Sequence, residues 1–366
     1  MGKYVTSGKA LIIYGPRQVG KTTLLEDYLS KINCKYRLDS GENIQIANIL
    51  NSQDFQLIKE YVEGYELIAI DEAHKIENVG LGLKIIVDHF KDIKIIATGS
   101  SSFELAGQVG EPLTGRKNTL ILYPVSQIEL CEDNTVFELK NLLSEYLIFG
   151  GYPEVLTTTD KERKIEILRE LVHSYLLMDI ISLEKIKGSK ILLDLLRLLA
   201  FQIGSEVSLA ELAQQLGINY KTVARYIDLF EKSFIIFSLR GFSRNLRKEV
   251  SKKNKYYFYD NGVRNAIISS FNSLELRNDT GQLWENFLVV ERLKKQAYKK
   301  IFANNNFWRT WDQKEIDWIE EREGKLYGYE FKYKDKPVKA PKDWLKTYDN
   351  ASFEVISRKN YLDFIL

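Results

Sequence analysis

Residues 15–22 read GPRQVGKT and directly follow a short apolar segment, Lys9 to Tyr14. The apolar segment predicts a buried β-strand, and an amphipathic helix is predicted to begin near Lys21. A Walker A loop requires this context, a glycine-rich turn between a strand and a helix. The order of elements therefore favours a P-loop nucleotide-binding domain over a glycine turn without function.

The residues of the loop have separate expected roles. Gly15 and Gly20 allow the backbone to turn successive amides toward phosphates, Lys21 reaches the β and γ phosphates, and the Thr22 hydroxyl can hold Mg²⁺. The expected ligands are ATP or ADP and Mg²⁺. The predicted nucleotide contacts are Gly15, Pro16, Arg17, Gln18, Val19, Gly20, Lys21, Thr22 and Thr23.

A second apolar segment, Leu67 to Ile70, ends in the carboxylates Asp71 and Glu72. This is the pattern of a Walker B strand, in which Asp71 would hold Mg²⁺ and Glu72 would act as general base toward the attacking water. An Asp-Glu pair at a strand end can also be a helix cap. The pair follows the Walker A loop by about 50 residues, which favours the catalytic interpretation.

A third strand is predicted at Lys94–Thr98, and hydroxyl side chains follow it. Ser100 would then lie at the carboxyl end of a parallel sheet and could sense the γ phosphate, although Ser100 and Ser101 could equally be helix N-caps. Further along, Arg116 could reach a phosphate in its own subunit or in a neighbour, which would require an oligomer. A solvated Arg116 is the alternative.

These segments together resemble a known family. The Walker A loop, LIAIDEAH at 67–74, TGSSS at 98–102, TGR at 114–116 and LYPVSQIEL at 122–130 look like the bacterial and archaeal AAA-type ATPases that carry a C-terminal domain of unknown function. The resemblance spans nearly the whole chain. It implies nucleotide contacts at Gly15, Gly20, Lys21 and Thr22, magnesium and water handling at Asp71 and Glu72, and a sensor role for Ser100. Relatives have a longer segment before the first strand, so the adenine pocket stays unassigned.

The middle of the chain, residues 136–250, is predicted to be helical. Apolar residues recur at helical spacing over 137–149 and 161–181, and the sequence GGYPE at 150–154 separates the two segments as a turn. Ser208 to Gly217 and Asn219 to Phe230 then have the pattern of a helix-turn-helix, with a strand expected at 234–239 that makes a winged variant. The predicted core residues are Leu209, Leu212, Leu216, Val223, Ile227 and Leu229, and the outward-facing residues are Tyr220, Lys221, Thr222 and Arg225.

A basic segment follows the expected wing. Residues 240–255 hold seven basic residues against one acidic residue, a local net charge of +6. Such a cluster gains affinity for DNA by displacing condensed counterions. A solvated hairpin and a contact between domains are the alternatives. The basic residues are Arg240, Arg244, Arg247, Lys248, Lys252, Lys253 and Lys255.

The C-terminal part, residues 251–366, carries a candidate metal site. A strand is predicted at 256–260, a helix at 282–295, and a hairpin whose strands hold Asp317 on one side and Glu330 and Lys332 on the other. Glu330 and Lys332 are two apart and project from the same face, so two carboxylates and a lysine could meet there for a divalent metal. Alternating charges on an exposed strand face are the simpler alternative.

This arrangement resembles the D-x(n)-ExK core of restriction-endonuclease-like folds, with Glu285 on the preceding helix matching an additional acidic position. The resemblance implies metal ligands at Glu285, Asp317 and Glu330 and a catalytic role for Lys332. Domains of this fold also serve as binding platforms without activity.

Composition limits the remaining possibilities. The chain has 366 residues, 45% hydrophobic and 28% charged, and 52 basic against 50 acidic residues give a net charge of +2. Two cysteines and three histidines argue against a disulfide framework or a structural zinc site. No apolar run is long enough to span a bilayer and residues 1–8 lack the core of a secretory signal, so a cytoplasmic location is expected.

The expected fold class is therefore α/β in three parts: a P-loop ATPase domain at 1–135, a helical lid with a winged helix-turn-helix at 136–250, and a restriction-endonuclease-like domain at 251–366. The leading hypothesis is an ATPase that couples nucleotide state to DNA binding, with a metal-dependent nuclease-like domain. The alternative is a nucleotide-switched regulatory or protein-interaction module whose nuclease-like domain is inactive.

Overall fold

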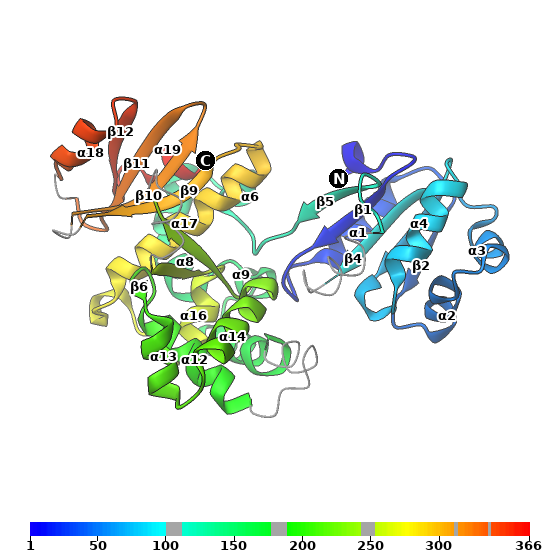
Figure 1. The fold of residues 1–366 in the computed structure, drawn as a ribbon, viewed down its shortest axis with the longest axis horizontal. Coiled ribbons are helices and arrows are strands. Elements are labelled where there is room, and N and C mark those ends of the chain that lie inside the picture. The colour runs from blue at the N-terminus through cyan, green and yellow to red at the C-terminus, as the bar shows by residue number, and fades with distance from the viewer. Residues whose placement is uncertain (100–111, 177–188, 243–252, 311–313, 336–337) are drawn as a thin grey trace. The chain divides into compact units, whose positions relative to one another are not determined.

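The computed structural model describes residues 1–99, 112–176, 189–242, 253–310, 314–335 and 338–366. They divide into two compact units, residues 1–123 with 232–234 and residues 124–231 with 235–366 (Figure 1). Among the described residues, no helix combines the length and the apolar character needed to cross a membrane.

Unit 1 is built on a five-stranded parallel sheet in the order β2-β3-β4-β1-β5. β1 and β3 are almost continuously apolar, as strands covered on both faces must be. The strands are β1 (Ala10–Tyr14), β2 (Tyr36–Ser40), β3 (Leu67–Asp71), β4 (Lys94–Gly99) and β5 (Lys117–Ile121).

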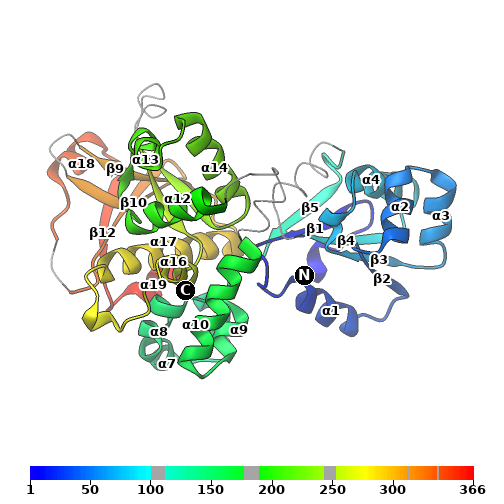
Figure 2. The same ribbon diagram turned by 90° about the horizontal axis from the view of Figure 1, so that it is seen from below.

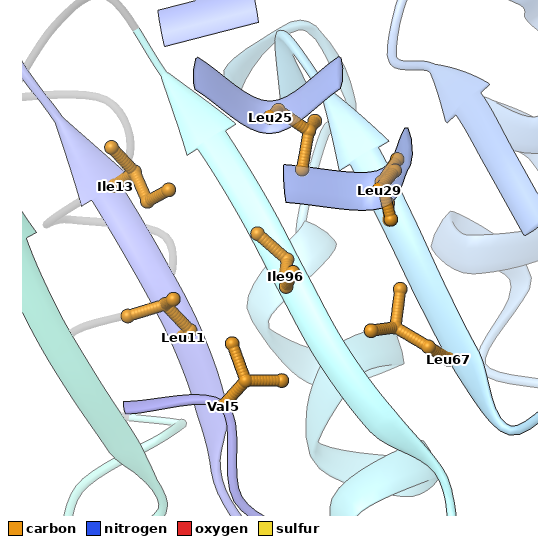
Figure 3. Packing of buried hydrophobic residues seen from close by; sticks show 8 residues of the cluster. Val5, Leu11, Ile13, Leu25, Leu29, Leu67 and Ile96 are labelled. Carbon is orange, nitrogen blue, oxygen red and sulfur yellow. The ribbon is translucent and has the colours of Figure 1, made fainter. Parts of the chain in front are cut away.

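Helices cover both faces of this sheet. α1 lies on one face, and α2, α3 and α4 lie on the other (Figure 2). Leu25 and Leu29 are one helical turn apart on α1 and pack against Leu11, Ile13 and Ile96 of the sheet (Figure 3). The helices are α1 (Lys21–Lys31), α2 (Ile44–Ser52), α3 (Phe55–Val62) and α4 (Val79–His89), with the 3-10 turns η1 (Gly2–Tyr4) and η2 (Ala73–Lys75).

Unit 2 contains a seven-stranded sheet in the order β12-β11-β10-β9-β7-β8-β6. β10 pairs antiparallel with β9 and β11, and β8 pairs antiparallel with β6 and β7. The strands are β6 (Glu206–Val207), β7 (Ile236–Gly241), β8 (Asn254–Phe258), β9 (Asn304–Arg309), β10 (Glu315–Arg322), β11 (Lys325–Phe331) and β12 (Ala351–Ile356).

Described helices cover most of the predicted helical segments 137–149 and 161–181, of which residues 177–181 lie outside the described residues. α6 and α7 each begin with a capping box, formed by Ser126 with Glu129 and by Thr135 with Glu138. The helices are α6 (Gln127–Leu130), α7 (Val136–Asn141), α8 (Leu143–Phe149), α9 (Pro153–Thr157), α10 (Lys161–Glu170), α12 (Ser189–Phe201), α13 (Leu209–Leu216), α14 (Tyr220–Lys232), α16 (Asn261–Ile267), α17 (Thr280–Lys299), α18 (Lys342–Thr347) and α19 (Tyr361–Ile365), with η3 (Leu171–Leu176) and η4 (Leu274–Leu276).

The GGYPE segment forms the turn that the sequence predicts. α8 ends at Phe149, and Gly150 follows it with a φ of 76°. A side chain on Gly150 would collide with the carboxylate of Asp260, which accepts a hydrogen bond from the Gly151 amide at 2.7 Å. Gly150 therefore lets the Asp260 carboxylate approach the backbone, while the absence of a side chain on Gly151 leaves room for the Val125 carbonyl.

The compact units do not coincide with the boundaries expected at residues 135 and 250. Unit 1 ends at residue 123, and the sheet of unit 2 continues across residue 250. β7 hydrogen-bonds both to β8 and, in parallel, to β9, so strands from both sides of that boundary share one sheet. Sequence periodicity identifies strands but does not show that two expected domains share backbone hydrogen bonds.

Candidate functional sites

The glycine-rich loop leaves β1 after Tyr14 and leads into α1 at Lys21. Gly20 caps the helix with a φ of 92°, and Gln18 has a φ of 60°. A side chain on Gly15 would collide with the backbone carbonyl of Leu122. Glycines thus stand where the turn needs a left-handed backbone and where another backbone approaches closely.

The Lys21 side chain folds back over this loop. Its Nζ donates to the carbonyl oxygens of Gly15 at 3.1 Å and Pro16 at 2.7 Å, and the residue is only 4% exposed. Of the other loop residues, Pro16 and Val19 are buried, whereas Gln18, Thr22 and Thr23 are exposed. The lysine charge lies inside the loop that the sequence predicts to surround phosphates.

The two predicted halves of the magnesium site meet at the carboxyl edge of the sheet. Thr22 Oγ1 donates to Asp71 Oδ2 at 2.7 Å, although the two residues are 49 positions apart. Thr98, at the end of β4 and fully buried, donates its hydroxyl to the other oxygen of Asp71 and accepts from the Glu72 amide at 3.0 Å. The Asp71 carboxylate is therefore oriented from both sides by hydroxyl groups.

Glu72 and His74 form the rim of this cluster. Glu72 has a left-handed backbone, φ 49° and ψ 38°, at the start of η2. Burial raises the pKa of Glu72, with Lys21 opposing and Asp71 adding to that rise. His74 Nδ1 lies 3.3 Å from Glu72 Oε2, and burial together with the charge of Lys75 lowers the pKa of His74 to about 4. At neutral pH the imidazole is uncharged.

The structure does not bring Arg116 to this cluster. The Arg116 carbonyl accepts from the Ala10 amide, at the edge where β1 and β5 begin. Five strand residues at about 3.3 Å each separate this edge from the loop, roughly 15 Å. Arg116 Nε pairs with Asp88 Oδ1 at 2.5 Å instead, so a contact with a phosphate of its own subunit is not supported. Ser100, the predicted sensor, lies outside the described residues.

The oxygen atoms of Thr22 and Asp71 fit Mg²⁺ bound together with a nucleotide. Mg²⁺ prefers hard oxygen ligands and in such sites takes one or two protein ligands, with phosphate and water oxygens completing the shell. The described residues contain no group of three His, Cys, Asp or Glu side chains that could hold a metal ion.

The C-terminal hairpin brings the second predicted cluster together. Trp318 pairs with Tyr329 across β10 and β11, which sets Asp317 opposite Glu330. Asp317 Oδ2 accepts from the Phe331 amide at 2.8 Å, and Lys332 Nζ donates to Glu330 Oε1 at 2.6 Å. Burial, with repulsion from Asp317, raises the pKa of Glu330 to about 7.

Glu285 joins the cluster from α17, but a lysine accompanies it. Tyr257 donates its hydroxyl to Glu285 Oε1 at 2.7 Å, and Lys255 Nζ lies 3.3 Å from the same oxygen. Lys255 Nζ also pairs with Glu315 and lies 3.9 Å from Asp317 Oδ1. Burial and repulsion from Asp317 raise the pKa of Glu285 to about 7.

These residues do not fit the metal site that the resemblance implies. An ammonium group already lies among three of the carboxylates, and within the described ranges no three acidic side chains form a metal-holding group. Lys255, which the sequence assigned to a basic DNA-facing segment, is 1% exposed and cannot contact DNA. That correction follows from the alternation along β8, which turns Lys255 and Tyr257 to the same side, against α17.

The predicted helix-turn-helix falls on α13 and α14. Ser208 caps α13, Gly217 ends it with a φ of 65°, and Val223, Ile227 and Leu229 of α14 are buried. Tyr220, Lys221 and Arg225 are exposed on α14. Of the basic segment, Arg240 is exposed and Lys253 lies 3.7 Å from Glu211, whereas residues 243–252 lie outside the described residues.

Comparison with known families gives a match over the first of these sites. Residues 7–131 match the family described as "AAA domain". This part of the chain is similar to AAA-type P-loop domains. The matched residues include the Walker A loop, Asp71 and Thr98, and they extend beyond residue 123, where the first segment of unit 1 ends. Residues 140–274 and 280–359 match two domains of unknown function, DUF8612 and DUF4143.

Similar proteins carry no description of function. An uncharacterized protein of Mycobacterium tuberculosis is 27% identical over 335 residues, covering 89% of this chain and 71% of that protein. An uncharacterized protein of Haemophilus influenzae is also 27% identical, covering 84% and 78%. One of Methanocaldococcus jannaschii is 24% identical over 375 residues, covering 95% and 82%.

Two solved structures show a weaker likeness. A DNA replication initiation factor is 17% identical, with a TM-score of 0.26, covering 62% of this chain and 83% of that one. Domain III of the Thermotoga maritima replication initiation protein DnaA is 15% identical, with a TM-score of 0.29, covering 47% and 86%. These TM-scores are too low to support a shared overall fold.

Three residues of these sites were not predicted from the sequence. Thr98 ends a predicted strand beside the Walker B strand, so its position was a usable signal. His74 follows Glu72 by two residues, within the LIAIDEAH segment. Lys255 and Tyr257 are two residues apart on a strand, so their side chains share a face. The position of Lys255 in a run of basic residues nevertheless indicated a solvent-facing role.

Proposed function

We propose that this chain binds and hydrolyses ATP at the loop of residues 15–22. The observation that carries the proposal is the hydrogen bond from Thr22 to Asp71, which joins the ends of α1 and β3 beside Lys21. An acidic residue at a strand end is common by itself, but a hydroxyl from a P-loop helix on a Walker B carboxylate serves Mg²⁺-nucleotide binding.

The chain supplies binding, orientation and a base. The loop amides and Lys21 bind the β and γ phosphates, and Thr98 holds Asp71 in orientation. Glu72 takes the proton of the attacking water, and its raised pKa strengthens it as a base compared with an exposed carboxylate. Thr22 and Asp71 would hold Mg²⁺, which would supply positive charge at the phosphate oxygens.

The test compares phosphate release by the wild type with and without EDTA. Hydrolysis should require Mg²⁺, and Glu72→Gln should bind ATP but release phosphate far more slowly than the wild type. Hydrolysis that survives both EDTA and this substitution would place the reaction elsewhere.

We further propose that unit 2 binds DNA through α14 as a winged helix. Support comes from the exposed Tyr220, Lys221 and Arg225 on the second helix of a helix-turn-helix, and from β6, β8 and β7, which form an adjoining antiparallel sheet. Nucleotide state would alter this binding, and Arg116 would act in trans if the chain forms a homo-oligomer.

The DNA proposal is tested by fluorescence anisotropy at several salt concentrations. Replacing Lys221 and Arg225 by Gln should weaken binding and reduce the salt slope by about 1 for each phosphate that the protein no longer neutralises. Replacing the exposed Lys161 and Arg163 of α10 by Gln removes the same charge and should leave the slope unchanged. Equal losses of affinity from both pairs would indicate non-specific attraction.

A second candidate function follows from Lys255. Its place among the acidic residues favours a C-terminal domain that retains the nuclease-like arrangement of Asp317, Glu330 and Lys332 without metal-dependent cleavage. The chain would then be a nucleotide-switched module that binds a partner. Incubating plasmid DNA with the protein, Mn²⁺ and ATP distinguishes a nuclease from a partner-binding module, because only a nuclease cuts the plasmid.

A further inference from the structure

Lys255 is the most deeply buried lysine in the described part of the chain. It lies on β8, the residue is 1% exposed, and its ammonium nitrogen lies 5.3 Å from the centre of the Phe307 ring. A lysine in such a place is stable only when its charge is compensated. The compensating groups come from two other elements.

Three carboxylates surround the ammonium. Glu285 approaches from α17 at 3.3 Å, Asp317 from β10 at 3.9 Å, and Glu315, also on β10, is in direct contact. Tyr257 and the Phe331 amide donate to oxygens of Glu285 and Asp317. The ammonium donates to Glu285 and contacts Glu315, whereas Asp317 at 3.9 Å is beyond hydrogen-bond distance and contributes its charge.

The positive charge of Lys255 also offsets the repulsion among the surrounding carboxylates. Glu330 adds a fourth carboxyl group, and Lys332 lies against it at 2.6 Å with its side chain 37% exposed. Without Lys255, the buried Asp317 and the partly buried Glu285 and Glu315 would face one another with no internal cation at their centre. Arg309, 3.9 Å from Glu315, lies at the margin of the group.

A divalent ion at Glu285 and Asp317 would occupy the space of this ammonium. Metal and lysine are therefore mutually exclusive, because displacing Lys255 would leave it buried and unpaired. Because Lys255 is part of the chain, its ammonium is always present at this position, whereas a metal ion must bind from solution and displace it.

We propose that Lys255 is an internal cation that takes the place of the divalent metal in the Glu285–Asp317 cluster, so that the C-terminal domain is complete without metal. This goes beyond the ATPase proposal and does not depend on it. It assigns to Lys255 the neutralising role of a metal ion and makes the domain a metal-free platform.

Mn²⁺ binding to the full chain, measured by calorimetry without nucleotide, tests this directly. Asp71→Asn serves as the background, because it removes the carboxylate of the other magnesium site. In that background the protein should bind no Mn²⁺. Adding Lys255→Met should create a site for one Mn²⁺ ion, and adding Asp317→Asn as well should abolish it.

Thermal unfolding gives a second readout. In EDTA, Lys255→Met should lower the Tm by about 10 °C, because it leaves buried carboxylates unpaired. Mn²⁺ should recover at least half of that loss in the variant and leave the Tm of the Asp71→Asn parent unchanged.

Lys332→Met is the matched control. It also removes an ammonium from a carboxylate of this cluster, but Lys332 lies at the exposed margin, so this variant should gain no Mn²⁺ site and lose little stability. The proposal fails if the parent binds Mn²⁺ and Asp317→Asn abolishes that binding. This comparison needs no change at Lys255 and holds even if Lys255→Met does not fold.

Discussion

Both units bury a lysine among oxygen atoms, but the oxygens differ in charge. Lys21 donates to the neutral carbonyls of Gly15 and Pro16, whereas Lys255 lies among carboxylates. A neutral partner can be exchanged for a phosphate with a gain in attraction, while a carboxylate cannot be abandoned without leaving a buried charge. The partner of a buried lysine, more than its burial, determines whether it is available to a ligand.

The largest expected effect tests whether the first cluster is catalytic at all. Glu72→Gln keeps the shape of the side chain and removes its basicity, so kcat for ATP hydrolysis should fall by about 10²–10⁴-fold. ATP affinity should change little, because the phosphate-binding loop is intact. Equilibrium binding and phosphate release measured on the same preparation separate the two, and turnover at the wild-type rate would show that another group positions the water.

Lys21→Ala sharpens the contrast between the two lysines. It should weaken ATP binding by about 10–100-fold through the loss of charge-assisted hydrogen bonds. Without nucleotide it should cost no more than about 1–2 kcal/mol of stability, since its hydrogen bonds to Gly15 and Pro16 go to neutral carbonyls. If Lys21→Ala lowers the Tm as much as Lys255→Met does, the two lysines do not differ in how strongly the folded protein depends on their charge.

The free energy of unfolding is expected to depend on pH through His74, whose pKa is affected by its burial, by the basic residues Lys75, Arg17 and Lys21 and by Asp71. Its folded pKa of about 4 lies below an unfolded value of about 6.5, so the stability that its neutral form contributes is present above pH 6.5 and is lost as the pH falls toward 4. At pH 5 the loss relative to pH 7 is about 2 kcal/mol.

Urea unfolding of the wild type and His74→Gln at pH 7 and pH 5 measures this loss. Glutamine does not titrate, so the wild type should lose more stability than the variant over this interval. An equal loss in both proteins would mean that His74 is charged in the folded state.

The smallest expected effect concerns the orientation of Asp71. Thr98→Val keeps the shape of the side chain but removes the hydroxyl that bonds Asp71 and Glu72, and should cost about 1–2 kcal/mol of stability. The KM for Mg²⁺-ATP should rise. Thr98→Ser retains the hydroxyl and should restore both properties, and a serine variant as impaired as the valine variant would point to packing instead.

The phosphate-binding loop was predictable because its information is local. Eight consecutive residues between a strand and a helix determine where Lys21 and Thr22 lie, and the alternation along β10 and β11 places Asp317 opposite Glu330. The partners of these residues were not predictable to the same degree. Thr98 reaches Asp71 because β4 is the neighbour of β3 in the sheet. The apolar periodicity of a sequence predicts strands but not their order in a sheet.

Lys255 and Arg116 show where a local pattern is not sufficient: Lys255 was placed in a solvent-facing basic run, and Arg116 was left open between a phosphate contact and a solvated position. Both were interpreted from neighbouring residues, a basic run for Lys255 and the TGR sequence for Arg116. Sheet registration decides both cases, because it turns Lys255 inward against α17 and sets Arg116 at the edge where the strands begin. Side-chain direction in a strand depends on register, and one residue of shift reverses it.

The continuous sheet of unit 2 has a practical consequence for dissecting the protein. β7 hydrogen-bonds to β9 through Arg240 and Gly241, and Phe242 adds a bond to Phe307 at 2.6 Å. A fragment cut at residue 250 would expose the edges of β7 and β9, and unpaired strand edges recruit other chains. The part of unit 2 that contains α13 and α14 and the part that contains the acidic cluster are therefore expected to fold and unfold together, and fragments that separate them should aggregate.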